Sequence, residues 1–219
     1  MDSSTKIMRL EIDGQWTADD MINSIKAVQD LYNLRLILQF EYEEWLEWRE
    51  FYHELKFFPP FRKRMQARLF FERDNFPSCS TIIPLNEDEL SRISELCYPN
   101  EILNVRRIKY GSKGIKDLAG IGEIIGHVKD FILELIHIRK DKEKRSLENE
   151  ERKLKNQHLQ LENAQKYVEL AKSIGLKKTE IRQLVKLADN KQEKLVDLID
   201  EGKIYGVRLL NSNEENLDI

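Results

Sequence analysis

The residue pairs best suited to metal chemistry are two carboxylate–histidine pairs. Glu50 with His53, and Glu134 with His137, share the spacing E-x-x-H within segments whose apolar periodicity predicts helix. A glutamate and a histidine three residues apart lie on one helix face, and di-iron bundles combine two such pairs with two further glutamates. The neighbouring predicted helices offer one suitable further glutamate rather than two. We therefore expect no metal site, no other cofactor and no catalytic residues.

A glycine-rich segment, residues 118–126 (LAGIGEIIG), has the residue types of a phosphate site. It resembles the G-I-G turn of helix-hairpin-helix motifs, whose backbone N–H groups bind a phosphate, and it half-matches a dinucleotide-binding pattern. A nucleotide site needs a strand that runs into the first glycine, whereas residues 115–119 favour helix. Glu123 also stands where a phosphate would sit. Close packing of small residues is the preferred interpretation, and a metal- or nucleotide-binding enzyme ranks third among the functions.

Residues 167–186 (YVELAKSIGLKKTEIRQLVK) resemble a helix-turn-helix motif. The small Ala171 lets two helices cross closely, and Gly175 can take the left-handed turn conformation. The second helix would direct five polar side chains toward a major groove: Lys177, Lys178, Thr179, Arg182 and Gln183. Because any helix–glycine–helix junction satisfies most of this pattern, a structural junction is favoured. A DNA-binding regulator is the alternative function.

An apolar stripe with heptad spacing runs along the second half of the chain. No glycine or proline lies between Gly126 and Gly175, so one long helix over about 121–173 is predicted. The positions four residues after each member of the stripe are polar, which indicates weak pairing that tightens toward Val168. The face expected to meet a partner comprises Leu147, Leu154, Leu161, Val168 and Ala171. A second copy, a hairpin within the chain and a different protein partner all remain open.

These residues are positioned by a predicted α+β fold, a small mixed sheet with covering helices followed by a mostly helical C-terminal half. Residues 1–112 form the α+β domain, with strands predicted over 6–12, 34–40 and 103–110. Residues 113–219 form a helical extension, with the long helix, a helix over 179–201 and a possible final strand over 203–210.

Composition narrows the class of protein. Of the 219 residues 34% are charged, yet the net charge is only −3, so the whole chain presents no basic surface for nucleic acid or lipid. Its two cysteines form no CxxC pair and no zinc spacing, so reduced thiols are expected, and no stretch is apolar enough to cross a membrane. A basic, aromatic stretch at 60–71 is expected to pair with the acidic face of residues 41–54. We predict a cytoplasmic, non-catalytic interaction or regulatory protein that forms a homodimer or docks another protein through its C-terminal helices, without membrane contact.

Overall fold

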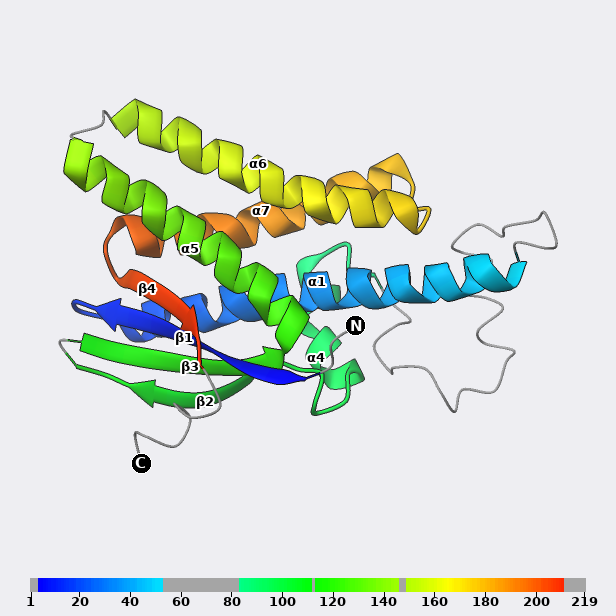
Figure 1. The fold of residues 1–219 in the computed structure, drawn as a ribbon, viewed down its shortest axis with the longest axis horizontal. Coiled ribbons are helices and arrows are strands. Elements are labelled where there is room, and N and C mark those ends of the chain that lie inside the picture. Colours follow the sequence, from blue (N-terminus) through cyan, green and yellow to red (C-terminus); the bar gives the residue numbers. More distant parts are fainter. Residues whose placement is uncertain (1–3, 53–82, 112, 146–148, 211–219) are drawn as a thin grey trace.

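The computed structural model describes residues 4–52, 83–111, 113–145 and 149–210, and Figure 1 shows their arrangement. The elements follow in the order β1 (Thr5–Asp13), α1 (Ala18–Tyr52), α3 (Glu87–Ser91), α4 (Ile93–Leu96), β2 (Asn104–Lys109), β3 (Lys113–Ile121), α5 (Gly122–Arg145), α6 (Asn149–Ser173), α7 (Lys178–Asp200) and β4 (Ile204–Leu209). The α+β class predicted from the sequence is confirmed.

The four strands form one sheet in the order β2-β3-β1-β4, and every pairing is antiparallel where a mixed sheet was expected. Helices α1, α5, α6 and α7 all lie on one side of this sheet (Figure 1). Apolar and charged side chains alternate along β1 because its two faces differ. Met8, Leu10 and Ile12 are buried beneath the helices, and Arg9 and Glu11 lie on the other face of the sheet. The strand expected over 203–210 corresponds to β4, which pairs with β1.

Residues 34–40, predicted to be a strand, lie instead in the middle of α1. Leu34, Leu36, Ile37 and Leu38 are all at most 1% exposed, although they point in different directions around the helix. A helix that is surrounded by other elements is apolar on all sides, so its sequence loses the helical period and looks like a buried strand. The prediction was wrong because burial, rather than backbone propensity, produced the apolar run.

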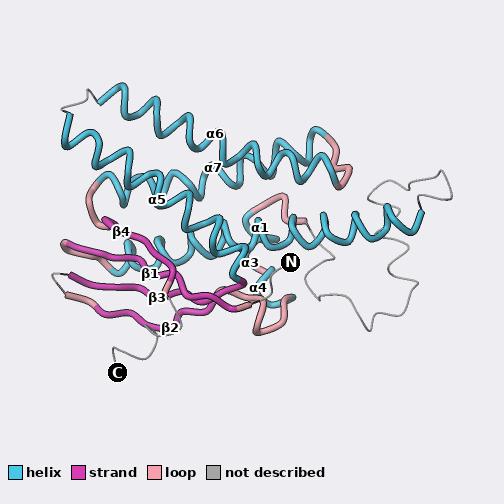
Figure 2. The backbone as a smooth tube through the Cα atoms, in the orientation of Figure 1, coloured by secondary structure: helices cyan, strands magenta, loops and turns pink. Residues whose placement is uncertain are grey.

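The single helix expected over about 121–173 is two helices, α5 and α6, which run in opposite directions and pack against each other (Figure 2). The apolar face of α5 reaches Ile136 in the core, and the next well-buried apolar residue that the structure describes is Leu159 on α6. The sequence between them is mostly charged. Folding back returns the second apolar face to the same core, so the hairpin within the chain is the arrangement observed.

Residues 115–119 were expected to be helical and belong instead to β3, which runs directly into α5.

Both halves of the sequence contribute to each of the two apolar cores. The larger core joins the sheet to α1, α5 and α7, and the smaller one joins α1 to α3, α4, α6 and α7. No helix within the described residues is long and apolar enough to span a bilayer.

Candidate functional site

The glycine-rich segment lies at the junction of β3 and α5. A Cβ atom on Gly120 would lie 2.7 Å from the Tyr32 ring, and one on Gly122 would lie 2.9 Å from the Ser4 carbonyl oxygen. The amides at this junction are also engaged, since Ile121 at the end of β3 donates to the Tyr32 hydroxyl at 2.9 Å and Gly122 at the start of α5 donates to the Ser4 carbonyl oxygen at 2.8 Å. The strand that a nucleotide site needs is therefore present, but these amides bind protein oxygens. The contacts support the interpretation that Gly120 and Gly122 allow close packing, but not the same expectation for Gly126, where a Cβ atom would meet nothing within 4 Å.

The helix-turn-helix-like segment forms the junction between α6 and α7. Ala171 is fully buried, and Gly175 has a φ of 82°, in the left-handed region that its position requires. The two helices lie side by side and run in opposite directions (Figure 1). All five predicted DNA contacts are exposed near the start of α7: Lys177, Lys178, Thr179, Arg182 and Gln183. DNA binding stays a prediction, which the salt dependence of duplex binding can test.

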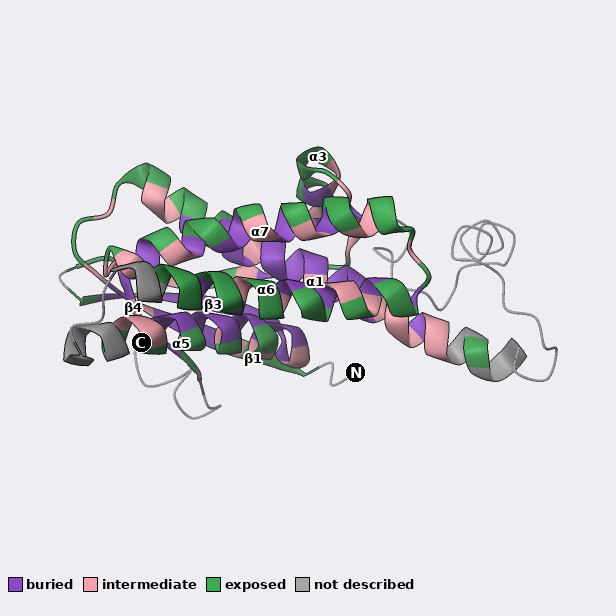
Figure 3. Cartoon of the chain, turned by 90° about the horizontal axis from the view of Figure 1, so that it is seen from above, coloured by how far each residue is buried: buried purple, intermediate pink, exposed green. Residues whose placement is uncertain are grey.

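Leu154 and Leu161 of the heptad stripe lie on the outer side of α6, whereas Ala171, expected on the same face, belongs to the chain's own core. Leu154 and Leu161 are each 65% exposed, Val168 is half-buried and Ala171 is fully buried. A different face of α6 packs into the chain's own cores, through Leu159, Ala164, Tyr167, Ala171 and Ile174. Leu147 lies outside the described residues. Seen from above, α6 presents a largely exposed surface (Figure 3).

The metal-ligand pairs do not come together within the part of the chain that the structure describes. Glu134 and His137 are exposed on α5, and no group of three or more potential ligands gathers among the described residues. His53 and the basic stretch at 60–71 lie outside the described residues, as does the side chain of Glu50.

A buried lysine is the first feature that the sequence analysis missed. Lys116 points from β3 toward the helices and is 0% exposed, with its Nζ donating to the Ser24 hydroxyl at 2.5 Å. The same Nζ lies 3.7 Å from the centre of the Trp16 ring. Burial lowers the pKa of Lys116 to about 7, and the charge of Asp20 only partly opposes this. An amine with such a pKa can act as a nucleophile, but this one is closed off from solvent.

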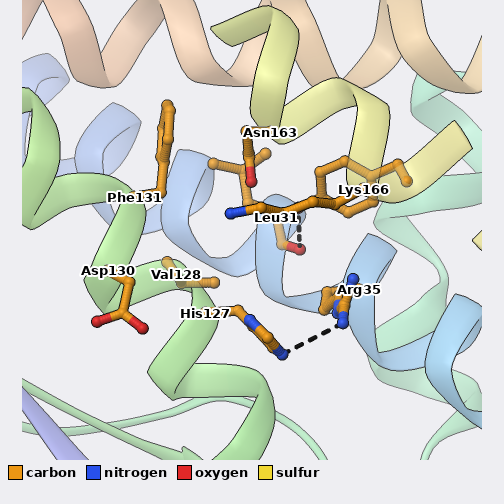
Figure 4. Close-up of a pocket in the computed structure, with 9 residues that line it drawn as sticks. Leu31, Arg35, His127, Val128, Asp130, Phe131, Asn163 and Lys166 are labelled. Atoms are coloured by element: carbon orange, nitrogen blue, oxygen red, sulfur yellow. Dashed lines mark hydrogen bonds between the residues drawn. The ribbon is translucent and has the colours of Figure 1, made fainter. Parts of the chain in front are cut away.

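A second missed feature is a small pocket between α1, α5 and α6, drawn in Figure 4. The Arg35 Nη2 atom lies 3.2 Å from the Nε2 atom of His127. Because a guanidinium can only donate, Nε2 accepts and the imidazole is neutral, with its proton on Nδ1. Burial of the ring is the main cause of the lowered pKa of His127, and the charge of Arg35 lowers it further. Asn163 and Lys166 extend toward the same pocket from α6.

A larger hollow of about 450 Å³ lies on the sheet face opposite the helices. At its centre Arg9 donates from Nε and Nη2 to the two carboxylate oxygens of Asp117, both at 2.8 Å. Arg107 approaches the same carboxylate at 3.8 Å. A bulge between Val105 and Arg107 lets Arg106 line the hollow beside Arg107. Three guanidiniums and one carboxylate therefore give this hollow a positive charge, and Arg9 joins the adjacent Arg106 and Arg107 only through the fold.

No protein-family model, no curated protein and no solved structure matches this chain. The geometry of the described residues therefore carries the argument for function.

Proposed function

We propose that the protein is a non-catalytic interaction protein that self-associates through the outer face of α6. The observation that carries this proposal is the exposure of Leu154 and Leu161, two leucines one heptad apart that the chain leaves on its surface. Scattered surface leucines need no explanation, but leucines repeated at heptad spacing form a continuous seam that a second helix can cover.

The seam is separate from the face by which α6 packs on its own chain. Leu159 and Tyr167 are 7% and 4% exposed and point into the cores, while Leu161 between them is 65% exposed. A partner can therefore cover the outer face without rearranging the fold. From Leu154 to Val168 the seam extends over roughly 21 Å, at 1.5 Å per helical residue, which favours a small and reversible interface.

The charges beside the seam favour a second copy as the partner. Lys155, Glu162 and Glu169 repeat at seven-residue spacing along one flank of the stripe, the basic residue first. If the two-fold axis that relates two copies is perpendicular to α6, the two α6 helices run antiparallel, so that Lys155 of each copy approaches the acidic end of the other. Opposite charges at such flanking positions set partner choice and orientation in paired helices.

The test is the molar mass of the full chain, measured by light scattering or sedimentation over a wide concentration range. The wild type is expected to shift from monomer to dimer as its concentration rises. The double variant Leu154→Gln with Leu161→Gln is expected to remain a monomer, because its seam can no longer exclude water. Both leucines are exposed, so the free energy of unfolding of the monomer should change by no more than about 0.5 kcal/mol per site.

A matched control is Lys153→Gln, which changes an exposed residue of α6 just beside the seam. This variant should dimerise like the wild type. A wild type that stays monomeric at every concentration, or a double variant that dimerises equally well, would contradict self-association through α6.

A further inference from the structure

We propose that the pocket between α1, α5 and α6 binds an oxyanion of the size and charge of phosphate. Arg35, Lys166 and Asn163 are its donors, and His127 lies at the mouth of the pocket. This site is independent of the outer face of α6 and of any dimer formed there.

The guanidinium of Arg35 provides the first argument. Its Nε atom is buried and has no hydrogen-bond partner, and the one hydrogen bond of its Nη2 is to the imidazole of His127, which is neutral. Burial also lowers the pKa of Arg35, since the charged group is partly removed from water. No carboxylate of the described residues forms an ion pair with Arg35, although Glu123 is close enough for its charge to oppose the effect of burial on the pKa of Arg35. A half-buried cation with no ion-pair partner is costly, and an anion bound in the pocket would offset its charge.

The three donors come from two helices and line one pocket, and His127 joins them from a third helix. Lys166 and Asn163 are three residues apart on α6 and face the same pocket as Arg35 from α1 and His127 from α5 (Figure 4). Lys166 is close enough to His127 for its charge to lower the pKa of the imidazole. Asp130 also lines the pocket, but its carboxylate points away from Arg35 and pairs with Lys129 at 2.5 Å (Figure 4).

The volume of the pocket restricts the ligand. About 50 Å³ is available, which holds roughly three or four water molecules and therefore one tetrahedral oxyanion. A sugar or a base cannot enter with it. Because His127 and Lys166 are exposed at the mouth, a larger molecule could still place a terminal phosphate in the pocket while its remainder stays in solvent. Planar guanidinium donors suit phosphate oxygens particularly well.

The proposal is tested by titrating the full chain with inorganic phosphate at constant ionic strength, followed by calorimetry and by the melting temperature. Glycerol 3-phosphate serves as a second probe. Phosphate should bind one to one and raise the melting temperature. Binding of both probes identifies the phosphate group of a larger ligand as sufficient, and binding of inorganic phosphate alone identifies a free anion as the ligand.

Arg35→Met should weaken phosphate binding at least tenfold, and Lys166→Gln several-fold. Lys166 is exposed, so its variant keeps the test valid even if Arg35→Met fails to fold. Lys172→Gln removes an exposed lysine of the same helix outside the pocket and should bind like the wild type. Absence of binding at millimolar phosphate, or unchanged affinity in Lys166→Gln and in any folded Arg35→Met, would overturn the proposal.

Discussion

At the scale of single residues, the fold is marked by charged side chains that it holds away from water. Lys191 on α7 is 3% exposed and contacts both Asp30 on α1, at 2.9 Å, and Glu87 on α3. Burial lowers the pKa of Lys191, yet its two acidic partners outweigh that effect and raise it. The amine of Lys116 has no such partner in contact, and its pKa falls. The partner, rather than burial alone, decides whether a buried lysine stabilises the fold.

Replacing Lys116 by methionine is expected to stabilise the protein by about 1–3 kcal/mol at pH 7, because an apolar chain of similar length fills the site without an ammonium group. The pKa of Lys116 is about 7 in the folded chain and 10.5 for the free side chain. The unfolded chain therefore binds the extra proton between these values, and the wild type gains stability as the pH rises from 7 to 10.5. The advantage of the variant should shrink over that window.

Urea unfolding at pH 7 and at pH 10 measures this difference. Lys113→Met, at an exposed position of the same strand, is the control and should change stability by no more than about 0.5 kcal/mol at either pH. A Lys116→Met variant that is less stable than the wild type at pH 7 would show that the charged amine stabilises the fold.

Features that depend on the spacing of residues along the chain could be predicted in part from the sequence, whereas features that depend on contacts between distant residues could not. The heptad pattern assigned Leu154, Leu161 and Ala171 to one partner face; Leu154 and Leu161 are exposed, but Ala171 is buried in the chain's own core. The role of Arg35 could not be predicted, because its pocket needs Lys166 and His127, more than ninety residues away in the chain. Lys116 gave only a weak signal, a lysine in an otherwise apolar alternation.

At the scale of elements, the junction of β3 with α5 organises the core. The Tyr32 hydroxyl donates to the Glu101 carbonyl oxygen at 2.7 Å and accepts from the Ile121 amide at 2.9 Å. Its ring occupies the space that a side chain at position 120 would need. One residue of α1 thereby fixes the end of a strand and the start of a helix.

Gly120→Ala is expected to lower the free energy of unfolding by about 1–3 kcal/mol, because its Cβ would lie 2.7 Å from a fully buried ring that two hydrogen bonds hold in place. Gly126→Ala is the control, since position 126 lies in α5 with nothing within 4 Å of its Cβ. It should stabilise the helix by roughly 0.5–1 kcal/mol. Urea unfolding of both variants decides the matter, and equal stability of the two would contradict this role of Gly120.

The elements that were mispredicted share one physical cause. In residues 34–40, an apolar run, and in residues 115–119, where the charged Lys116 and Asp117 are buried, the surroundings decide between helix and strand. The break between α5 and α6 has no proline or glycine in the sequence, and it follows from where the core ends. Elements with strong local signals, such as β1 and α7, lie close to the expected residues.

At the scale of the whole molecule, the sequence was divided at residue 112, yet the sheet draws strands from both sides of that position. β1 pairs with β3 and β4, which lie beyond residue 112, and β2 pairs with β3. Leu31 of α1 and Leu195 of α7 belong to the same core. The two segments bury each other's apolar surface, so neither has a complete core of its own.

One cooperative unfolding transition is therefore expected for the whole chain. The three tryptophans all lie within residues 16–48. Helices α5, α6 and α7 lie beyond residue 121 and contribute most of the helical circular dichroism signal of the described residues. Tryptophan fluorescence and far-ultraviolet circular dichroism should give the same urea midpoint at a concentration where the protein is monomeric.

Leu195→Ala removes a fully buried side chain from α7 and should lower the free energy of unfolding by about 2–5 kcal/mol. It should move both midpoints together, because α7 shares its core with the tryptophan-bearing segment. Two separate midpoints, or a shift confined to circular dichroism, would show that residues 1–112 fold independently of the helices that follow.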